Sequence, residues 1–321
     1  MKKKNACNTI LVCGSLVYDR IMDFPGEFKD HILPEKIHIL NVSFTINKLR
    51  ESFGGTAGNI AYNLSLLGEK PIILGRVGTD FFKYEKWLKN QKIDTARIGK
   101  SKKELTASAY IITDRADNQI TGFYPGPLDK KYCRVAKKIK NVKIAIVSPD
   151  AKLRMLEYLK IYKKSNVSYI FDPGQQIINF SEKELRWAIA GSKVLIGNDY
   201  EIQLVLKKLN INLAKLEKMT EILVITKGAK GSEIHNRGKI IKIPSAKPKN
   251  TSDPTGAGDA YRAGLIKGLV EGWPLEKTGR LAALVAVYTV EKYGTQTHRF
   301  SWAGLKKRYR ENFGDCLRIT N

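Results

Sequence analysis

The feature that most restricts the fold of this chain is a repeated alternation of short apolar runs with amphipathic segments. The apolar runs lie at 9–16, 71–77, 143–147, 167–171, 193–196 and 221–225. Helical spacing of apolar residues follows most of them, at 58–67, 151–164, 182–190 and 201–209, and again at 259–270 and 275–293. Strands that alternate with helices pair in parallel through right-handed crossovers. The pattern therefore predicts an α/β fold with a doubly wound, mostly parallel sheet flanked by helices.

Two stretches, 20–50 and 105–125, interrupt this alternation. Their apolar residues recur at every second position, as in 108–113, which predicts strands instead of helices. We expect these stretches to form a small β-sheet that projects from the main body, with irregular surface hairpins as the alternative. No repeat or linker divides the chain, so we expect residues 1–321 to form one domain with this sheet inserted in it.

The composition bounds the class of protein. Of the 321 residues, 43% are hydrophobic, which is enough for a sizeable core, yet no run reaches the roughly 18 apolar residues that span a membrane. The basic start, Met1–Lys4, precedes an apolar run without a cleavage site for a signal peptide, so we interpret that run as a buried strand. The spacing of the cysteines fits neither a metal site nor a redox motif, which predicts reduced thiols and a cytoplasmic protein; they are Cys7, Cys13, Cys133 and Cys316.

The strongest sign of chemistry is the run 253–264 in the C-terminal third. Asp253-Pro254 indicates a turn, and Gly256, Ala257 and Gly258 have almost no side chains where a helix begins. Their N–H groups and the positive end of the helix dipole would form an anion site. Asp259 would repel an anion held there, but it suits a base that takes a proton from a hydroxyl group during phosphoryl transfer. A helix-capping acid is the alternative.

Other polar loops fall where ligands bind in doubly wound sheets, beyond the carboxyl ends of the strands. Asp19 follows the first run, and its carboxylate could accept two hydrogen bonds from adjacent hydroxyls or simply end a strand. Asn198 and Glu201 follow the fifth run at a spacing that also fits a capping box. Thr226 and Gly228 follow the sixth run without the spacing of a P-loop. The segment 54–61 precedes a helix without the spacing of a dinucleotide site.

Four of these motifs resemble, in their order along the chain, those of the ribokinase (PfkB) family of sugar and nucleoside kinases; they are 54–61, 198–201, 226–231 and 253–264. The resemblance implies that Asp259 is the catalytic base and that Gly256, Ala257 and Gly258 form the anion hole. It implies that Asn198, Thr226, Gly228, Gly256 and Gly258 bind ATP, and that Glu201 holds Mg²⁺ directly or through water. It also gives the small projecting sheet the role of a lid over the substrate.

Several stretches resemble bacterial adenosine kinases more specifically; they are 24–28, 33–35, 42–44, 122–126, 172–176, 198–201 and 294–296. This resemblance extends from about residue 10 to 296 and implies that the chain transfers the γ-phosphoryl group of ATP to the 5′-hydroxyl of a ribonucleoside, adenosine above all. The implied ribose contacts are Ser15, Asp19, Ser43, Gly55 and Asn59. The implied base contacts are Phe123, Gln175 and Gln176, since a base needs an aromatic ring and amides.

One residue departs from the adenosine kinase pattern. Ala109 stands where a second lid aromatic is expected, which would broaden the choice of nucleoside. A sugar kinase of the ribokinase or fructokinase type is the alternative function. The family resemblance also suggests a homodimer formed through the lid.

The net charge of +25, from 56 Lys and Arg against 31 Asp and Glu, is typical of proteins that bind nucleic acid. The lysines are scattered, however, and no basic run is interleaved with aromatic residues. We therefore expect a solvated lysine-rich surface that attracts anions such as ATP in a salt-dependent way, with no nucleic-acid or membrane partner. A nucleic-acid-binding protein built on a kinase fold is the remaining alternative.

Overall fold

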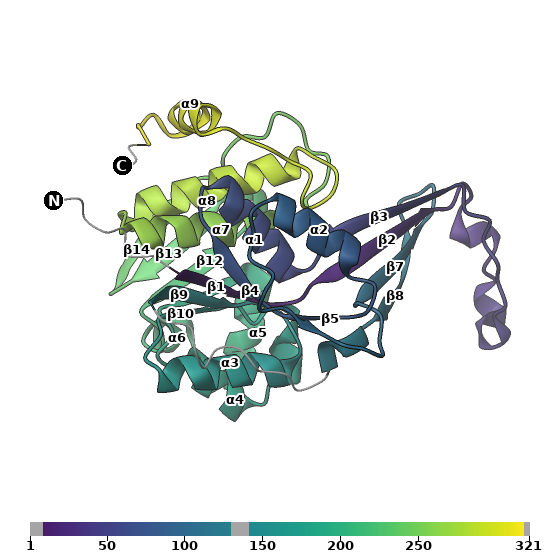
Figure 1. Ribbon diagram of the computed structural model, residues 1–321, viewed down its shortest axis with the longest axis horizontal. Coiled ribbons are helices and arrows are strands. Elements are labelled where there is room, and N and C mark those ends of the chain that lie inside the picture. The colour runs from purple at the N-terminus through teal and green to yellow at the C-terminus, as the bar shows by residue number, and fades with distance from the viewer. Residues whose placement is uncertain (1–8, 130–140, 318–321) are drawn as a thin grey trace.

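An eight-stranded sheet runs through the computed structural model, which describes residues 9–129 and 141–317 (Figure 1). Its strands lie in the order β14-β13-β12-β11-β10-β9-β1-β4. The six parallel strands are β1 (Thr9–Cys13), β4 (Pro71–Leu74), β9 (Val142–Val147), β10 (Tyr169–Phe171), β11 (Val194–Asn198) and β12 (Ile222–Thr226). β13 (Ser232–Asn236) and β14 (Lys239–Ile243) add an antiparallel edge. The predicted doubly wound, mostly parallel sheet is confirmed.

Helices cover both faces of this sheet. Successive residues of each parallel strand point to opposite faces and so enter two different cores. In β1, Ile10 and Val12 enter one core, whereas Leu11 and Cys13 enter the other. The first core is covered by α1 (Thr56–Leu66), α7 (Ala257–Glu271) and α8 (Leu275–Val290). The second is covered by α3 (Lys152–Lys164), α4 (Glu182–Ile189) and α5 (Asp199–Leu209), on the lower side in Figure 1.

Shorter elements complete the main body. α2 (Phe82–Asn90) follows β5 (Arg76–Val77), which pairs with β6 (Gly99–Lys100), and α6 (Leu213–Glu217) precedes β12. α9 (Trp302–Phe313) begins after Ser301, whose hydroxyl accepts a hydrogen bond from the N–H of Gly304. Short 3-10 turns are η3 (Gly126–Asp129), η5 (Gly174–Asn179) and η6 (Gly228–Lys230). Among the described residues, no helix combines the length and the apolar character that a membrane crossing requires.

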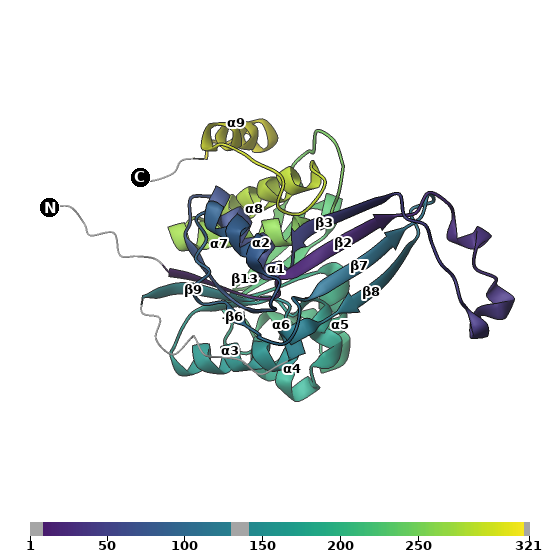
Figure 2. The same ribbon diagram turned by 45° about the vertical axis from the view of Figure 1, so that its right-hand side comes forward.

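The second sheet has four strands in the order β3-β2-β7-β8 and projects from the main body (Figures 1 and 2). They are β2 (Val17–Asp23), β3 (Lys48–Gly54), β7 (Ser108–Thr113) and β8 (Gln119–Tyr124). Between β2 and β3, the 3-10 turns η1 (Phe28–Asp30) and η2 (Pro34–Ile39) extend still further outward (Figure 2). The two stretches that interrupt the alternation therefore do form a separate small sheet.

The structure corrects several predicted boundaries. β2 already begins at Val17, so Asp19 lies within a strand, opposite Ser52 and Ala109, and not in a loop. The run 71–77 is divided between β4 and β5, which belong to different sheets. Cys13 and Cys316 are thiols, while Met1–Lys4, Cys7 and Cys133 lie outside the described residues.

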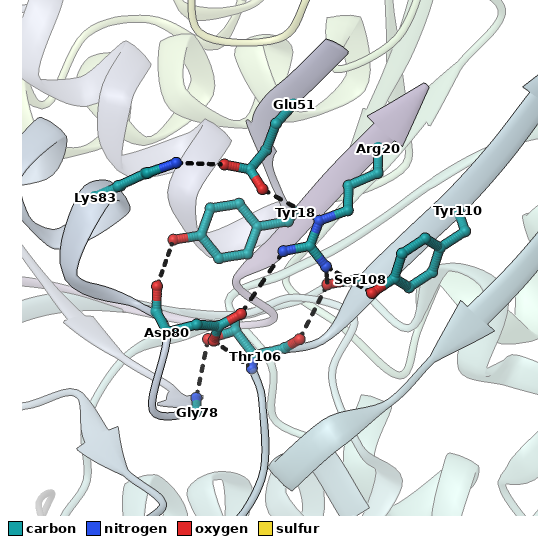
Figure 3. Close-up of polar contacts among 9 residues, drawn as sticks. All are labelled: Tyr18, Arg20, Glu51, Gly78, Asp80, Lys83, Thr106, Ser108 and Tyr110. Atoms are coloured by element: carbon teal, nitrogen blue, oxygen red, sulfur yellow. Dashed lines mark hydrogen bonds and ion pairs between the residues drawn. The ribbon is translucent and has the colours of Figure 1, made fainter. Parts of the chain in front are cut away.

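A polar cluster around Arg20 holds the base of the small sheet together (Figure 3). The Arg20 guanidinium donates to Glu51 on β3 (3.1 Å) and to the hydroxyls of Ser108 and Tyr110 on β7 (both 2.8 Å). It also lies 3.7 Å from Asp80, which belongs to the main body. One side chain therefore joins three strands of the small sheet to the loop before α2.

The same loop is tied to the start of β7 by backbone and side-chain contacts. Asp80 Oδ1 accepts a hydrogen bond from the N–H of Thr106 (2.7 Å), and the Asp80 C=O accepts one from the Tyr18 hydroxyl (3.1 Å). The Thr106 hydroxyl in turn accepts from the N–H of Gly78 (3.0 Å) (Figure 3). These contacts fix where the small sheet leaves the main body.

Candidate active site

The first turn of α7 carries the predicted catalytic run. Gly256 caps this helix with φ of +79°, a left-handed conformation that side chains disfavour, and a Cβ there would lie 2.9 Å from Thr295 Cγ2. The Ala257 N–H donates to the Pro254 C=O (3.1 Å), so the turn itself uses one of the predicted anion-hole donors. Gly258 and Asp259 follow at the positive end of the helix dipole.

The Asp259 carboxyl lies close to one amide side chain and to several charged side chains. Its Oδ2 accepts a hydrogen bond from Asn59 Nδ2 on α1 (2.9 Å). Burial raises the pKa of the Asp259 carboxyl to about 6, and the negative charges of Asp172 and Glu201 act in the same direction, whereas Arg262 and Asn59 lower it. A carboxyl group poised near neutral pH is suited to take up a proton and release it again.

Arg262, one turn after Asp259, is held by Asp172 at the end of β10. The guanidinium donates to both oxygens of that buried carboxylate, through Nε to Oδ2 and through Nη2 to Oδ1 (2.8 Å). A Cβ on Gly258 would lie 2.8 Å from Arg262 Nη1, so glycine at 258 lets the guanidinium approach the backbone of the first turn. The pair places a fixed positive charge beside the candidate base.

These groups line a central cavity of about 240 Å³. The predicted residues that it brings together are Gln175, Asn198, Glu201, Thr226, Gly256, Gly258 and Asp259. Asp172 and Arg262 also line it. Residues from four separate segments of the chain thus meet at the carboxyl edge of the sheet, as expected for a doubly wound fold.

Asn198 and Glu201 form a capping box at the start of α5. Asn198 Oδ1 accepts from the Glu201 N–H, and Glu201 Oε2 accepts from the Asn198 N–H, both at 2.8 Å. Burial raises the pKa of the Glu201 carboxyl.

Among the described residues, no cluster of three or more His, Cys, Asp or Glu could hold a metal. The Glu201 carboxylate at the wall of the central cavity fits Mg²⁺, which binds in proteins through one or two carboxylates, waters and substrate phosphates.

Two further cavities adjoin the central one. A mostly apolar cavity of about 350 Å³ shares Thr226 and Gly258 with it and is also lined by Gly228 and Ala257. A third cavity, of about 360 Å³, shares Pro149 and Gln175 with it. The three cavities therefore form a row with Asp259 in the middle.

The third cavity contains half of the predicted acceptor residues. Ser15, Phe123, Gln175 and Gln176 line it, and Phe123 is 56% exposed. The Ser15 hydroxyl accepts a hydrogen bond from the Thr56 N–H (3.2 Å), which links the loop after β1 to the start of α1.

Asp19 and Gly55 belong to the junction between the two sheets. A Cβ on Gly54 would lie 2.2 Å from Asp19 Oδ2, and one on Gly55 would lie 2.5 Å from the Ser15 carbonyl oxygen, so both glycines permit close packing here. Burial, reinforced by the charge of Asp253, raises the pKa of Asp19 to about 6.

Ser43 is the predicted residue that the structure keeps apart from the others. It is exposed and lies between η2 and β3, in the segment that extends outward from the small sheet (Figure 2).

Sequence reasoning assigned no role to Asp172, Arg262 or Gln296, although all three occur in motifs that carry the resemblance. Their charge or amide groups were the available signal, but their partners lie 90 to 237 residues away in sequence.

Comparisons with known proteins identify the family of this chain. Residues 16–301 match the family described as pfkB family carbohydrate kinase. The chain belongs to the pfkB family. Membership makes it a phosphotransferase that acts on a hydroxyl group, and it supports ATP binding.

Two relatives to which this chain is similar are nucleoside kinases. This pfkB-family chain is 36% identical over 277 residues to a nucleoside kinase of Methanocaldococcus jannaschii, covering 85% of this chain and 91% of that protein. It is similar to the Burkholderia thailandensis nucleoside kinase in complex with inosine, with a TM-score of 0.85, 34% identity and coverage of 96% and 99%. The complex of that kinase with ADP-inosine gives a TM-score of 0.84 at 35% identity, with coverage of 97% and 98%.

Proposed function

We propose that this protein transfers the γ-phosphoryl group of ATP to the 5′-hydroxyl of a ribonucleoside, with adenosine as one acceptor. The observation that carries the proposal is the row of three cavities with Asp259 in the middle one. The apolar cavity would take the adenine of ATP, the central cavity its phosphates, and the third cavity the acceptor. Relatives named as nucleoside kinases, one in complex with inosine, support a nucleoside as the acceptor.

In this mechanism Asp259 takes the proton from the attacking hydroxyl, an effect worth about 10²–10⁴-fold. The Gly258 amide, the α7 dipole and the Arg262 guanidinium stabilise the negative charge on the group being transferred. Glu201 would hold Mg²⁺ through water, and the ion would neutralise charge on the phosphates. Asn198, Thr226, Gly228 and Gly256 complete the proposed ATP site.

The acceptor would be held at the junction of the two sheets. Ser15, Asp19, Gly55 and Asn59 would bind the ribose, and Phe123, Gln175 and Gln176 would bind the base. Ala109 faces Phe123 across β7 and β8 and supplies no second ring, so we propose that several nucleosides are accepted.

The small sheet is proposed to act as a lid on a single kinase domain. Closure would exclude water from the phosphates. Ser43 could join an acceptor site only if its segment moved or came from another copy, and a homodimer through the lid is part of the proposal. We place the reaction in the cytoplasm, as predicted from the cysteine pattern, without a nucleic-acid partner.

The test is an ATP-consumption assay with adenosine, guanosine, inosine, cytidine, ribose and fructose 6-phosphate, run with the native protein and Asp259→Asn. We expect turnover of several nucleosides and a loss of at least about 10²-fold in kcat in the variant. Turnover of a free sugar alone would favour the ribokinase-type alternative. An active Asp259→Asn variant would refute the role of the base.

A further inference from the structure

Asp259 ends a chain of hydrogen bonds, buried at its middle, that begins at Trp87 on α2. The indole Nε1 of Trp87 donates to Gln296 Oε1 (3.0 Å), and Gln296 Nε2 donates to Asn59 Oδ1 (3.0 Å). Asn59 Nδ2 then donates to Asp259 Oδ2 (2.9 Å). Gln296 and Asn59 are 3% and 4% exposed, so neither amide can easily exchange these partners for water.

The chemistry of the partners determines which way the Gln296 amide points. An indole N–H can only donate, so the Gln296 atom facing Trp87 must be the oxygen. Tyr84 determines the same orientation of the Gln296 amide independently. Its hydroxyl donates to the Gly54 C=O (2.9 Å) and therefore accepts from Gln296 Nε2 (2.6 Å).

The orientation of the Gln296 amide also determines the orientation of the Asn59 amide. Because Gln296 presents an N–H, Asn59 must turn its Oδ1 towards Gln296 and its Nδ2 towards Asp259. The opposite orientation would place an amide oxygen against the carboxylate, with two acceptors facing each other. Gly58 makes the approach possible, since a Cβ there would lie 1.8 Å from the Tyr84 hydroxyl oxygen and 3.0 Å from Gln296 Nε2.

We infer that Gln296 is a positioning residue that fixes the orientation of the Asn59 amide and thereby keeps a hydrogen-bond donor on Asp259. The inference rests on the proposed role of Asp259 as the base. It gives Gln296 a role in the phosphoryl-transfer reaction although its side chain bonds to Trp87, Tyr84 and Asn59 and acts on Asp259 only through Asn59.

The other groups that act on Asp259 define what the test must leave unchanged. Three charged groups act on the Asp259 carboxyl; they are Arg262 on α7, Asp172 after β10 and Glu201 on α5. The titratable Tyr84 hydroxyl on α2 also interacts with it. Replacing Gln296 by an uncharged residue alters none of the three charged groups. A change in the protonation of Asp259 would then report the Asn59 hydrogen bond.

The first variant is Gln296→Met, which removes both amide groups and keeps a long side chain. The Asn59 amide can then rotate, and the apparent pKa of the acid limb of kcat/KM for the acceptor should rise by about one pH unit. Because ionised Asp259 is the active form, kcat/KM should fall about fivefold at pH 6 and stay nearly unchanged at pH 8. A purely structural role would instead lower kcat/KM equally at both pH values.

Three further variants make the test specific. Thr297→Val, next in the same loop, removes hydrogen bonds to Tyr293 and Gly294 and should leave the pH profile unchanged. Trp87→Phe removes the indole donor while Tyr84 still orients Gln296, so it should shift the limb in the same direction but less than Gln296→Met. In an Asn59→Leu background, Gln296→Met should cause no further shift, because Gln296 acts through Asn59.

A ¹³C NMR titration of aspartate carboxyl groups, with Asp259 assigned from Asp259→Asn, reads out the same hydrogen bond without turnover. A raised Asp259 pKa in Gln296→Met supports the inference, and an unchanged one overturns it. Failure of the proposed function looks different, since the native protein would then show no acid limb that depends on Asp259.

Discussion

At the scale of single residues, the proposed mechanism makes activity depend on the protonation of Asp259. The pKa of Asp259 is raised to about 6, mainly by burial. If Asp259 is the proposed base, the ionised form is active and the protonated form is inactive. We predict that kcat/KM falls about tenfold per pH unit below pH 6 and is flat above pH 7. A pH–rate profile checks this, with unfolding monitored by circular dichroism at each pH. A rate that does not decline down to pH 4.5 would contradict the prediction.

The glycine caps of α7 allow a matched comparison at its two ends. Gly256 and Gly272 both have left-handed φ, +79° and +70°, but a Cβ meets Thr295 only at Gly256 and finds open space at Gly272. We predict that each alanine variant loses roughly 1–2 kcal/mol of unfolding free energy from backbone strain. Only Gly256→Ala should also lower kcat, by about tenfold or more, because it displaces the first turn that carries Asp259. Urea denaturation and steady-state kinetics of both variants provide the measurement, and equal kinetic losses would show that strain alone is responsible.

At the scale of elements, the small sheet depends on the Arg20 cluster at its base. Arg20→Met removes hydrogen bonds to Glu51, Ser108 and Tyr110, which should cost about 1.5–3 kcal/mol because the donor is charged. Arg50→Met, on the neighbouring strand, removes a more exposed pair with Asp23, which is worth about 0–1 kcal/mol.

Hydrogen exchange of backbone amides distinguishes these two variants. Arg20→Met should accelerate exchange in β2, β3 and β7 while β1 and β9 keep their protection. Arg50→Met should change little. If both variants had the same exchange pattern, the Arg20 cluster would not be what holds this sheet.

The parallel strands and long helices were predictable because both faces of the large sheet are buried, which leaves continuous apolar runs. The hairpin of β13 and β14 was missed. Its turn uses Arg237 and Gly238, both with positive φ, and arginine at such a position is not the usual hairpin signal. α2 was missed because its buried residues are only Tyr84 and Leu88.

Residues of the candidate site were predictable where a short segment of the chain contains a recognisable motif. Gly256, Gly258 and Asp259 stand together in sequence, and so do Asn198 and Glu201. The role of Gln296 could not be read in this way, because its partners Trp87, Tyr84 and Asn59 precede it by more than two hundred residues. Asp19 was assigned to a loop because the first strand and β2 follow each other with only three residues between them.

At the scale of the whole molecule, the net charge of +25 should act on the charged substrate and not on the neutral one. We predict that KM for ATP rises severalfold between about 50 and 300 mM KCl, because salt screens the attraction. KM for a neutral nucleoside should change by less than about twofold over the same range. The acceptor is thus an internal control, and a parallel rise in both constants would point to a general salt effect on the fold.

The order of strands in the large sheet has a consequence for synthesis of the chain. β9 pairs with the free edge of β1, on the side away from β4, and each later strand from β10 to β14 pairs with the outer edge of the one made before it. A chain emerging from the ribosome can therefore extend the sheet in the order of translation, without having to open pairs already formed. The helix that carries Asp259 is translated after all eight strands, and Gln296 later still. A nascent chain could hold most of its sheet while lacking the proposed base, so enzymatic activity would report completion of translation and not the onset of folding.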